Sequence, residues 1–307
     1  MPELQHVSQA QSHPREIAGL DGLRALAVVA VILFHAEINR LFPGGFLGVD
    51  VFFTLSGFLI TTLILNELSQ TGRLQLGRFY LRRFRRLFPA LFAVLIACAV
   101  WAVYGAADSI AALRQDFVPS LLYVSNFWQL LSAQPYFEKF GRPHVLQHLW
   151  SLAIEEQFYT LWPLLVVIAF RMAGRRLVFG VSLVLSLATA GWAWYLANRI
   201  GIPYEAQPER LYFGTDTHTV GVFVGTLLAA ALHGRAGMVG GQGWHRFAGW
   251  AALAGVLYTF AYVDESSYWL YRLGFPAIAL ATCVLVTNVA LPGTPLNRLF
   301  EWLPLKW

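Results

Sequence analysis

Apolar runs long enough to cross a bilayer recur along the whole chain, and no other feature constrains its fold as strongly. A transmembrane helix needs about 20 consecutive, mostly apolar residues. Charged residues make up 13% of the 307 residues, whereas a soluble domain has about 25%. The sequence therefore predicts an all-α fold, a polytopic bundle of transmembrane helices.

We expect about eight spans, and the arginines give them a direction. The densest arginine segment is 69–88, and 171–176 is also basic. Cytoplasmic loops carry an excess of Lys and Arg, so both segments and both ends of the chain are predicted to be cytoplasmic. These loops account for the net charge of +5, and we expect no nucleic-acid partner. The expected spans are 19–38, 46–68, 89–107, 148–170, 177–196, 211–232, 247–263 and 270–291.

The first expected span carries two polar side chains, Arg24 and His35, in an otherwise apolar helix. They are 11 positions apart, which returns both to nearly the same face and separates them by roughly 16 Å along the axis. An intramembrane charge costs about 2.5–3.5 kcal/mol on insertion scales, so such residues tend to face a cavity or a partner.

The direction of each span sorts the polar residues by membrane side. We place Asp21, Arg24 and the arginines of 82–86 near the cytoplasmic side. The residues expected in the outer half are His35, Asp50, His148, Glu155, Glu156, Asp216 and His218.

Each of these residues also has a purely structural explanation. His35 could be an interfacial residue near a helix end. Arg24 could form a local ion pair with Asp21, three positions earlier. Glu155 and Glu156 point about 100° apart, so at most one faces a given partner. A functional site is favoured because these polar residues form two groups, one on each side of the membrane.

The outer group suits acyl transfer. A histidine near a carboxylate can act as general base toward a hydroxyl, and Glu155 or Asp50 would orient the imidazole as the acid does in a triad. Ser56 lacks a GxSxG context, which favours direct attack by an activated acceptor over an acyl-serine. Cytoplasmic arginines suit phosphate groups. A donor with phosphates at one membrane face and a reactive end roughly 16 Å deeper would match the Arg24–His35 spacing, and coenzyme A has that shape.

Five blocks in this order resemble the integral-membrane acyltransferase-3 family, whose members O-acylate cell-surface sugars, peptidoglycan and antibiotics. The resemblance covers about 17–230. The blocks are the Arg24-x10-His35 pair, GVDVFFTLSGFLI (48–60), FYLRRFRRLFP (79–89), HLWSLAIEEQFYTLWP (148–163) and YFGTDTHTVGVFVGTLLA (212–229).

The resemblance assigns roles to individual residues. Arg24 and His35 match the family's essential Arg-x10-His pair, Arg83 and Arg86 match its cytoplasmic RxxR motif, and Glu155 matches the acidic residue of its WSLxxE block. It implies acyl-CoA, in particular acetyl-CoA, as cytoplasmic donor. The implied acceptor is a hydroxyl of an extracytoplasmic carbohydrate or related molecule. We expect contact with membrane lipid, no metal, and location in the bacterial inner membrane.

Two features depart from the family pattern. His218 stands where related sequences often have arginine. The family domain has about ten spans and a late SYxxYLxH block, which this chain lacks. We therefore expect residues 1–16 to be a disordered cytoplasmic tail and 17–307 to be an acyltransferase-3 membrane domain that is truncated at its C-terminal end.

Two other functions remain open at this point. One is a proton-coupled transporter or flippase of a small molecule or lipid-linked sugar, with a relay through His35, Glu155 and Asp216. No inverted repeat of the first three spans is visible in the last four, which counts against it. The other is a scaffold without catalysis.

Overall fold

The computed structural model describes residues 19–36, 42–132, 144–206, 208–235, 243–291 and 294–302. Across these residues every regular element is a helix and no strand occurs, which confirms the predicted all-α fold. The longer helices are α1 (Leu20–His35), α2 (Gly48–Thr71), α3 (Leu76–Gly105), α4 (Ile110–Leu121), α6 (Leu149–Arg199), α9 (Val220–Leu232), α10 (Gly243–Tyr262) and α11 (Phe275–Val289). Shorter helices are η2 (Gly45–Leu47), η3 (Ala107–Ser109), α5 (Ser125–Leu131), α7 (Glu209–Phe213), α8 (Thr215–His218), η4 (Leu270–Gly274) and α12 (Pro295–Phe300).

Four helical stretches are long and apolar enough to cross a membrane: Gly45–Thr71, Leu76–Gly105, Leu149–Arg199 and Leu270–Val289. α9 is a shorter apolar helix. Each of the eight predicted spans overlaps a helix, so the described chain has the build of a helical membrane bundle. The count of eight crossings and their direction stay predictions. The tail 1–16 lies outside the described residues.

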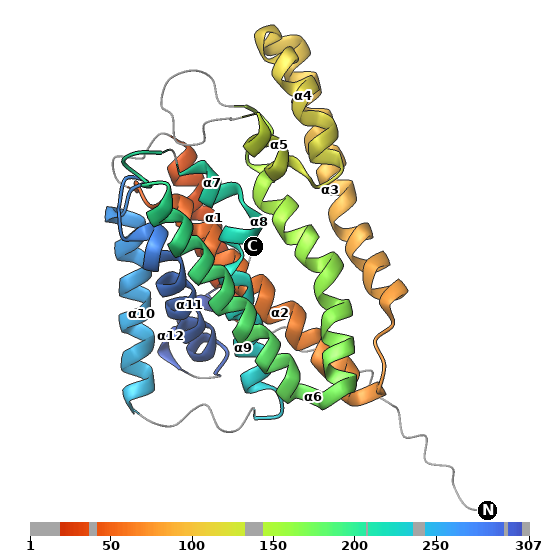
Figure 1. Ribbon diagram of the computed structural model, residues 1–307, viewed down its shortest axis with the longest axis vertical. Coiled ribbons are helices and arrows are strands. Elements are labelled where there is room, and N and C mark those ends of the chain that lie inside the picture. The colour runs from red at the N-terminus through yellow and green to blue at the C-terminus, as the bar shows by residue number, and fades with distance from the viewer. Residues whose placement is uncertain are drawn as a thin grey trace, which may run out of the picture.

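The basic segment before the third predicted span is helical. α3 begins at Leu76, thirteen positions before the predicted start at 89. Arginine and leucine are good helix formers, and an arginine can keep its charged head in water while its stem lies along an apolar surface. The arginines of 78–86 are therefore held on a helix. With α4 packed beside it, α3 extends beyond the rest of the bundle (Figure 1).

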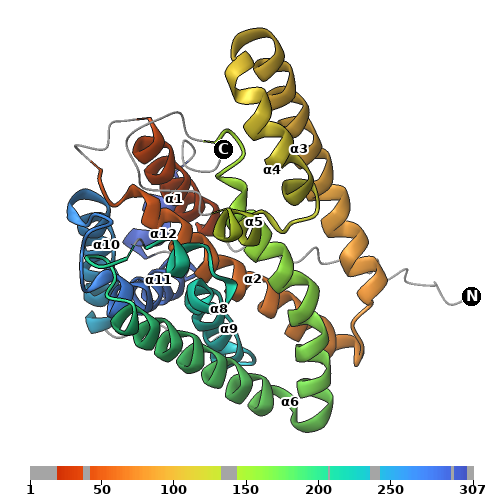
Figure 2. The same cartoon turned by 45° about the horizontal axis from the view of Figure 1, so that its top comes forward.

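The fourth and fifth predicted spans form the two arms of α6, two helical segments joined at a sharp kink (Figure 2). The bend lies at Ala173 and Gly174, and Gly174 has φ 62° and ψ −156°. This conformation is accessible to glycine and strained for other residues. α8 and α9 pack between the arms. The sixth predicted span is also interrupted, because Gly214 adopts an extended conformation between α7 and α8.

The core is organised around the contact between α2 and α9. A Cβ atom on Gly57 would come within 1.9 Å of the Val222 carbonyl oxygen, and one on Gly225 within 2.1 Å of the Thr54 carbonyl oxygen. Small residues at such points let two backbones approach closely, as is common between membrane helices. This close contact fixes the rotation of α2, so that Asp50 faces α8 and Ser56 faces α6.

Candidate functional site

A cavity of about 240 Å³ lies among α1, α2, α3 and α6, and it gathers four of the six predicted site residues. Arg24, Arg83 and Arg86 contribute three guanidinium groups, and Glu155 contributes a carboxylate. The three arginines come from two helices, so the fold brings together charges that lie about 60 positions apart in the sequence. The remaining lining residues are Phe52, Ser56, Leu59, Ile60, Leu63, Leu87 and Tyr159.

Two consecutive hydrogen bonds link α2 and α6 along one wall of this cavity. The Tyr159 hydroxyl donates to Ser56 Oγ at 2.6 Å. Ser56 Oγ in turn donates to Glu155 Oε1. A hydrogen bond between membrane helices stabilises their packing by about 0.6 kcal/mol on average. These two hydrogen bonds therefore help to fix Glu155 in the cavity wall.

Arg83 is held by two neighbours on α6. Its guanidinium carbon lies 3.2 Å from the centre of the Tyr159 ring, and its Nη2 lies 3.7 Å from Glu156 Oε1. Arg24 pairs with Asp21 at 2.9 Å, as the local i,i+3 explanation expected, and still lines the cavity. Glu155 accepts from Ser56 and Glu156 pairs with Arg83, but the Arg83 charge also acts on Glu155, so their angular separation does not give the two carboxylates separate partners. The cavity lining carries three guanidinium groups and one carboxylate. Two of these arginines also pair with Asp21 or Glu156, and among the described residues Arg86 has no such pair, which suits the cavity to an anion.

Glu155 lies with the arginines rather than with His35, contrary to the sorting by side. It follows His148 by seven residues, and helix rise over that distance is about 10 Å, roughly a third of the membrane core. The residue therefore lies deep enough to meet Arg24 and Arg83, whose charges act on its carboxylate.

Asp50 lies in a separate buried pair with His218. Asp50 Oδ1 is 3.2 Å from His218 Nε2, and both side chains are about 1% exposed or less. Tyr212 and Phe275 pack on the imidazole, with ring centres 4.7 and 4.6 Å away. Asp50 was predicted to orient His35, whereas here its carboxylate faces the histidine of α8. No partner was predicted for His218, because the two residues are 168 positions apart in the sequence.

His35 is the last residue of α1, and its side chain is exposed. Its Nδ1 lies 2.8 Å from the Val31 carbonyl oxygen. That oxygen can only accept, so Nδ1 carries the hydrogen and Nε2 is the acceptor nitrogen of the neutral ring. Phe34 packs edge-on at 5.2 Å, and His148 is near enough for the two imidazoles to interact electrostatically. The imidazole thus lies at the opposite end of α1 from Arg24.

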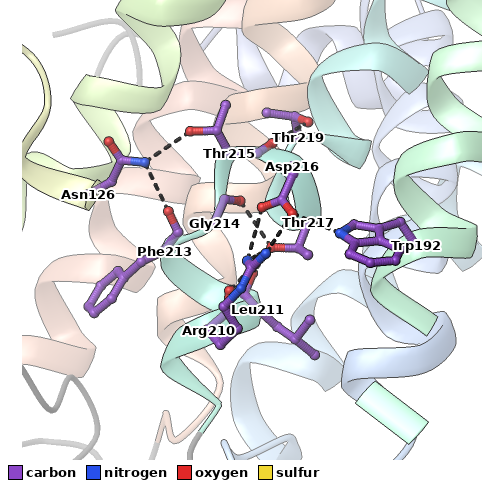
Figure 3. Close-up of polar contacts among 10 residues, drawn as sticks. All are labelled: Asn126, Trp192, Arg210, Leu211, Phe213, Gly214, Thr215, Asp216, Thr217 and Thr219. Atoms are coloured by element: carbon purple, nitrogen blue, oxygen red, sulfur yellow. Dashed lines mark hydrogen bonds and ion pairs between the residues drawn. The ribbon is translucent and has the colours of Figure 1, made fainter. Parts of the chain in front are cut away.

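A further polar cluster joins α5, α7, α8 and the second arm of α6 (Figure 3). Arg210 donates to both carboxylate oxygens of Asp216, at 2.9 and 2.6 Å, and Trp192 Nε1 donates to the same carboxylate at 2.7 Å. Asn126 donates to Thr215 Oγ1 at 2.9 Å. Asp216, a member of the alternative proton relay, is therefore engaged by two donors. Among the described residues, no group of three or more His, Cys, Asp and Glu side chains could hold a metal.

Residues 17–304 match a protein family described as "Acyltransferase domain", Acyl_transf_3. The chain belongs to the acyltransferase-3 family. This confirms the resemblance drawn from the Arg24–His35 pair and the four sequence blocks. No solved structure matches the chain.

Curated relatives of this acyltransferase-3 chain are named as O-acetyltransferases. It is 35% identical to the peptidoglycan O-acetyltransferase OatA of Listeria monocytogenes, covering 95% of the chain and 47% of that relative. It is 36% identical to the putative peptidoglycan O-acetyltransferase YrhL of Bacillus subtilis, covering 96% and 46%. A putative O-acetyltransferase of Staphylococcus aureus is 34% identical over 94% of the chain and 47% of the relative. The chain spans about half the length of the curated relatives it matches.

Proposed function

We propose that this chain is a membrane O-acyltransferase that moves an acyl group, acetyl in the first instance, from acyl-CoA to a hydroxyl of an extracytoplasmic glycan such as peptidoglycan. The observation that carries the proposal is the cavity in which Arg24, Arg83 and Arg86 converge. The named activities of the relatives support the O-acetyl transfer. Guanidinium groups are the side chains best suited to bidentate phosphate binding, and coenzyme A is a phosphate-bearing acyl donor.

In the proposed mechanism, donor binding and general base catalysis take place at opposite ends of α1. Arg24, with Arg83 and Arg86, binds the phosphates of the donor at one end. His35, about 16 Å further along the axis by helix rise, is the general base at the other. The long arm of the donor spans this distance. Glu155 and Ser56 form the polar wall between α2 and α6 along which the arm lies.

His35 Nε2 takes the proton from the acceptor hydroxyl as its oxygen bonds to the thioester carbonyl carbon. The carbon–sulfur bond then breaks, and the proton held on His35 is returned to the departing sulfur. The acceptor gains the acyl group and the donor leaves as the free thiol. Asp50, the third predicted catalytic residue, acts in this scheme on His218, which fixes α2 against α8 near the outer end of α1.

The experiment that tests the donor site compares two matched double variants of the full chain in detergent. Arg83→Ala with Arg86→Ala removes two cavity arginines, and Arg78→Ala with Arg85→Ala removes two exposed arginines of the same helix. We expect acetyl-CoA binding to weaken at least about tenfold in the first, since each charge-assisted hydrogen bond contributes about 1.5–3 kcal/mol. The control should bind as wild type.

Equal binding by wild type and the Arg83/Arg86 variant would contradict the donor site. The transport alternative makes a different prediction, namely substrate movement across vesicles without consumption of acetyl-CoA. The ion pair between Arg210 and Asp216 works against that alternative, because a relay carboxylate must exchange its proton readily and pairing with a cation favours the ionised form.

A further inference from the structure

A second basic cavity lies at the bend of α6, apart from the candidate donor site. Its volume is about 240 Å³. It shares no lining residue with the cavity that contains Arg24. The residues around it are Arg175, Arg176, Phe179, Ala230, Ala231 and Arg235.

One of its three arginines is built into the wall. Arg175 Nη1 donates to the carbonyl oxygens of Ala230, Ala231 and His233, at 3.3, 3.2 and 3.3 Å. These carbonyls lie at the C-terminal end of α9, where a helix leaves its last oxygens without internal partners and carries partial negative charge. Arg175 therefore closes α9 and fixes one side of the cavity.

The other two arginines are exposed and lack an opposite charge. Within the described part of the chain, the side chains of Arg176 and Arg235 make no hydrogen bond or ion pair, and no carboxylate lines the cavity. Burial and the nearby Arg175 charge lower the pKa of His233, which disfavours its charged form. The arginines give the site its positive charge, which suits it to an anion.

The rest of the cavity is apolar, which narrows the class of anion. Phe179 begins the apolar second arm of α6, and Ala230 and Ala231 lie in the last two turns of apolar α9. A free anion gains nothing from such a wall, whereas a lipid can place its phosphate on the arginines and its glycerol and first methylenes on the apolar side. Basic pockets between membrane helices are typical sites for anionic headgroups.

We propose that this cavity binds the phosphate of an anionic phospholipid from the leaflet that adjoins the α6 bend. Arg176 and Arg235 grip the phosphate oxygens, and Phe179 packs on the adjoining apolar part of the lipid. The bound lipid thereby joins the turn of α6 to the end of α9. The proposal is independent of the acyl-transfer function, because none of the lining residues belongs to the donor cavity.

The competing explanation is that these arginines act only as a topology signal. The chain offers a matched control, since Arg171 lies five residues before Arg176 and Arg246 lies eleven residues after Arg235. Both are exposed and neither lines the cavity. The test measures retention of phosphatidylglycerol, cardiolipin or phosphatidylcholine by the purified full chain, using native mass spectrometry and lipid-dependent thermal unfolding. The variants are Arg176→Gln with Arg235→Gln, and Arg171→Gln with Arg246→Gln.

We expect wild type and the Arg171/Arg246 control to prefer the two anionic lipids over phosphatidylcholine. The Arg176/Arg235 variant should lose about tenfold or more in affinity for them and keep the lipid-free Tm of wild type. Equal losses in both variants, or no preference in wild type, would overturn the proposal. Saturation of the site by inorganic phosphate alone, with loss of the lipid effect, would overturn the lipid assignment in favour of a soluble anion.

Discussion

His35 combines exposure with a fixed orientation, which is what a general base needs. Its hydrogen bond to the Val31 carbonyl holds the ring on the last turn of α1. His35→Ala should lower acetyl transfer at least about 100-fold, since general base catalysis contributes about 10²–10⁴-fold. Acetyl-CoA binding and the Tm should stay at wild-type values, because the side chain is exposed and outside the arginine cavity.

Radiolabel transfer to glycan and direct acetyl-CoA binding, measured on the same preparation, separate the two effects. His245→Ala, in the first turns of α10, is the histidine control and should transfer normally. Transfer by His35→Ala at the wild-type rate would remove the histidine from the proposed mechanism.

The Asp50–His218 pair has a different predicted signature, because it is fully buried. Breaking a buried pair by removing one partner costs about 3–5 kcal/mol. Asp50→Asn and His218→Gln should each lower the free energy of unfolding by an amount of this order, and the double variant should lose much less than the sum. Asp21→Asn, in the exposed pair with Arg24, should change it by about 0.5 kcal/mol or less.

Thermal and denaturant unfolding of the four variants completes the double-mutant cycle. Additive losses from Asp50 and His218 would show that the two side chains act separately. A loss of transfer in Asp50→Asn without any change in stability would instead favour the predicted role of Asp50 toward His35.

At the scale of the helices, the α2–α9 contact depends on two glycines. A methyl group on Gly57 or Gly225 would meet backbone carbonyl oxygens that cannot move aside independently. Gly57→Ala and Gly225→Ala should each destabilise the protein by about 1–3 kcal/mol, the usual cost of overpacking. Gly180→Ala, in α6 with nothing near its Cβ position, should be neutral or slightly stabilising, because alanine is the better helix former.

The measurement is the shift in Tm for the three variants in one detergent. A Tm for Gly57→Ala at or above that of Gly180→Ala would mean that α2 and α9 can move apart without loss of stability. Their close approach would then not hold the bundle together.

Helix positions were predictable from the sequence to the extent that apolar runs define them. All eight predicted spans overlap helices, and the break predicted between the fourth and fifth spans agrees with the non-helical backbone at Ala173 and Gly174. The run length could not reveal that α3 starts at Leu76. Arginine-rich segments look like loops by hydropathy, although arginine favours helix. The sequence placed Arg24 on the same side as Arg83 and Arg86, which agrees with their shared cavity. It placed Glu155 with His35 instead, because hydropathy does not show how deep a residue lies in its helix, and the Asp50–His218 pair depends on tertiary packing and left no local signal.

At the scale of the whole molecule, the direction of the bundle in the membrane is the largest prediction still to be tested. Gln75, before α3, should face the cytoplasm, and Ser266, before η4, should face outside; both are exposed. With Cys98 and Cys283 replaced by alanine, Ser266→Cys in intact cells should react with an impermeant maleimide. Gln75→Cys should react only after the membrane is opened. The reverse pattern would invert the topology and place the arginine cavity on the wrong side for cytoplasmic acyl-CoA.

The α2–α9 contact also bears on how the protein is made. Its two glycines are 168 positions apart in the chain, and ribosomes add about 5–20 residues per second, so roughly 8–35 s separate their synthesis. During that interval α2 has entered the membrane without the helix that covers its glycine face, and Asp50 has not yet met His218. Nascent α2 therefore needs a temporary partner, either the insertion machinery or α1, and variants that weaken this holding step would lower yield without altering the finished protein.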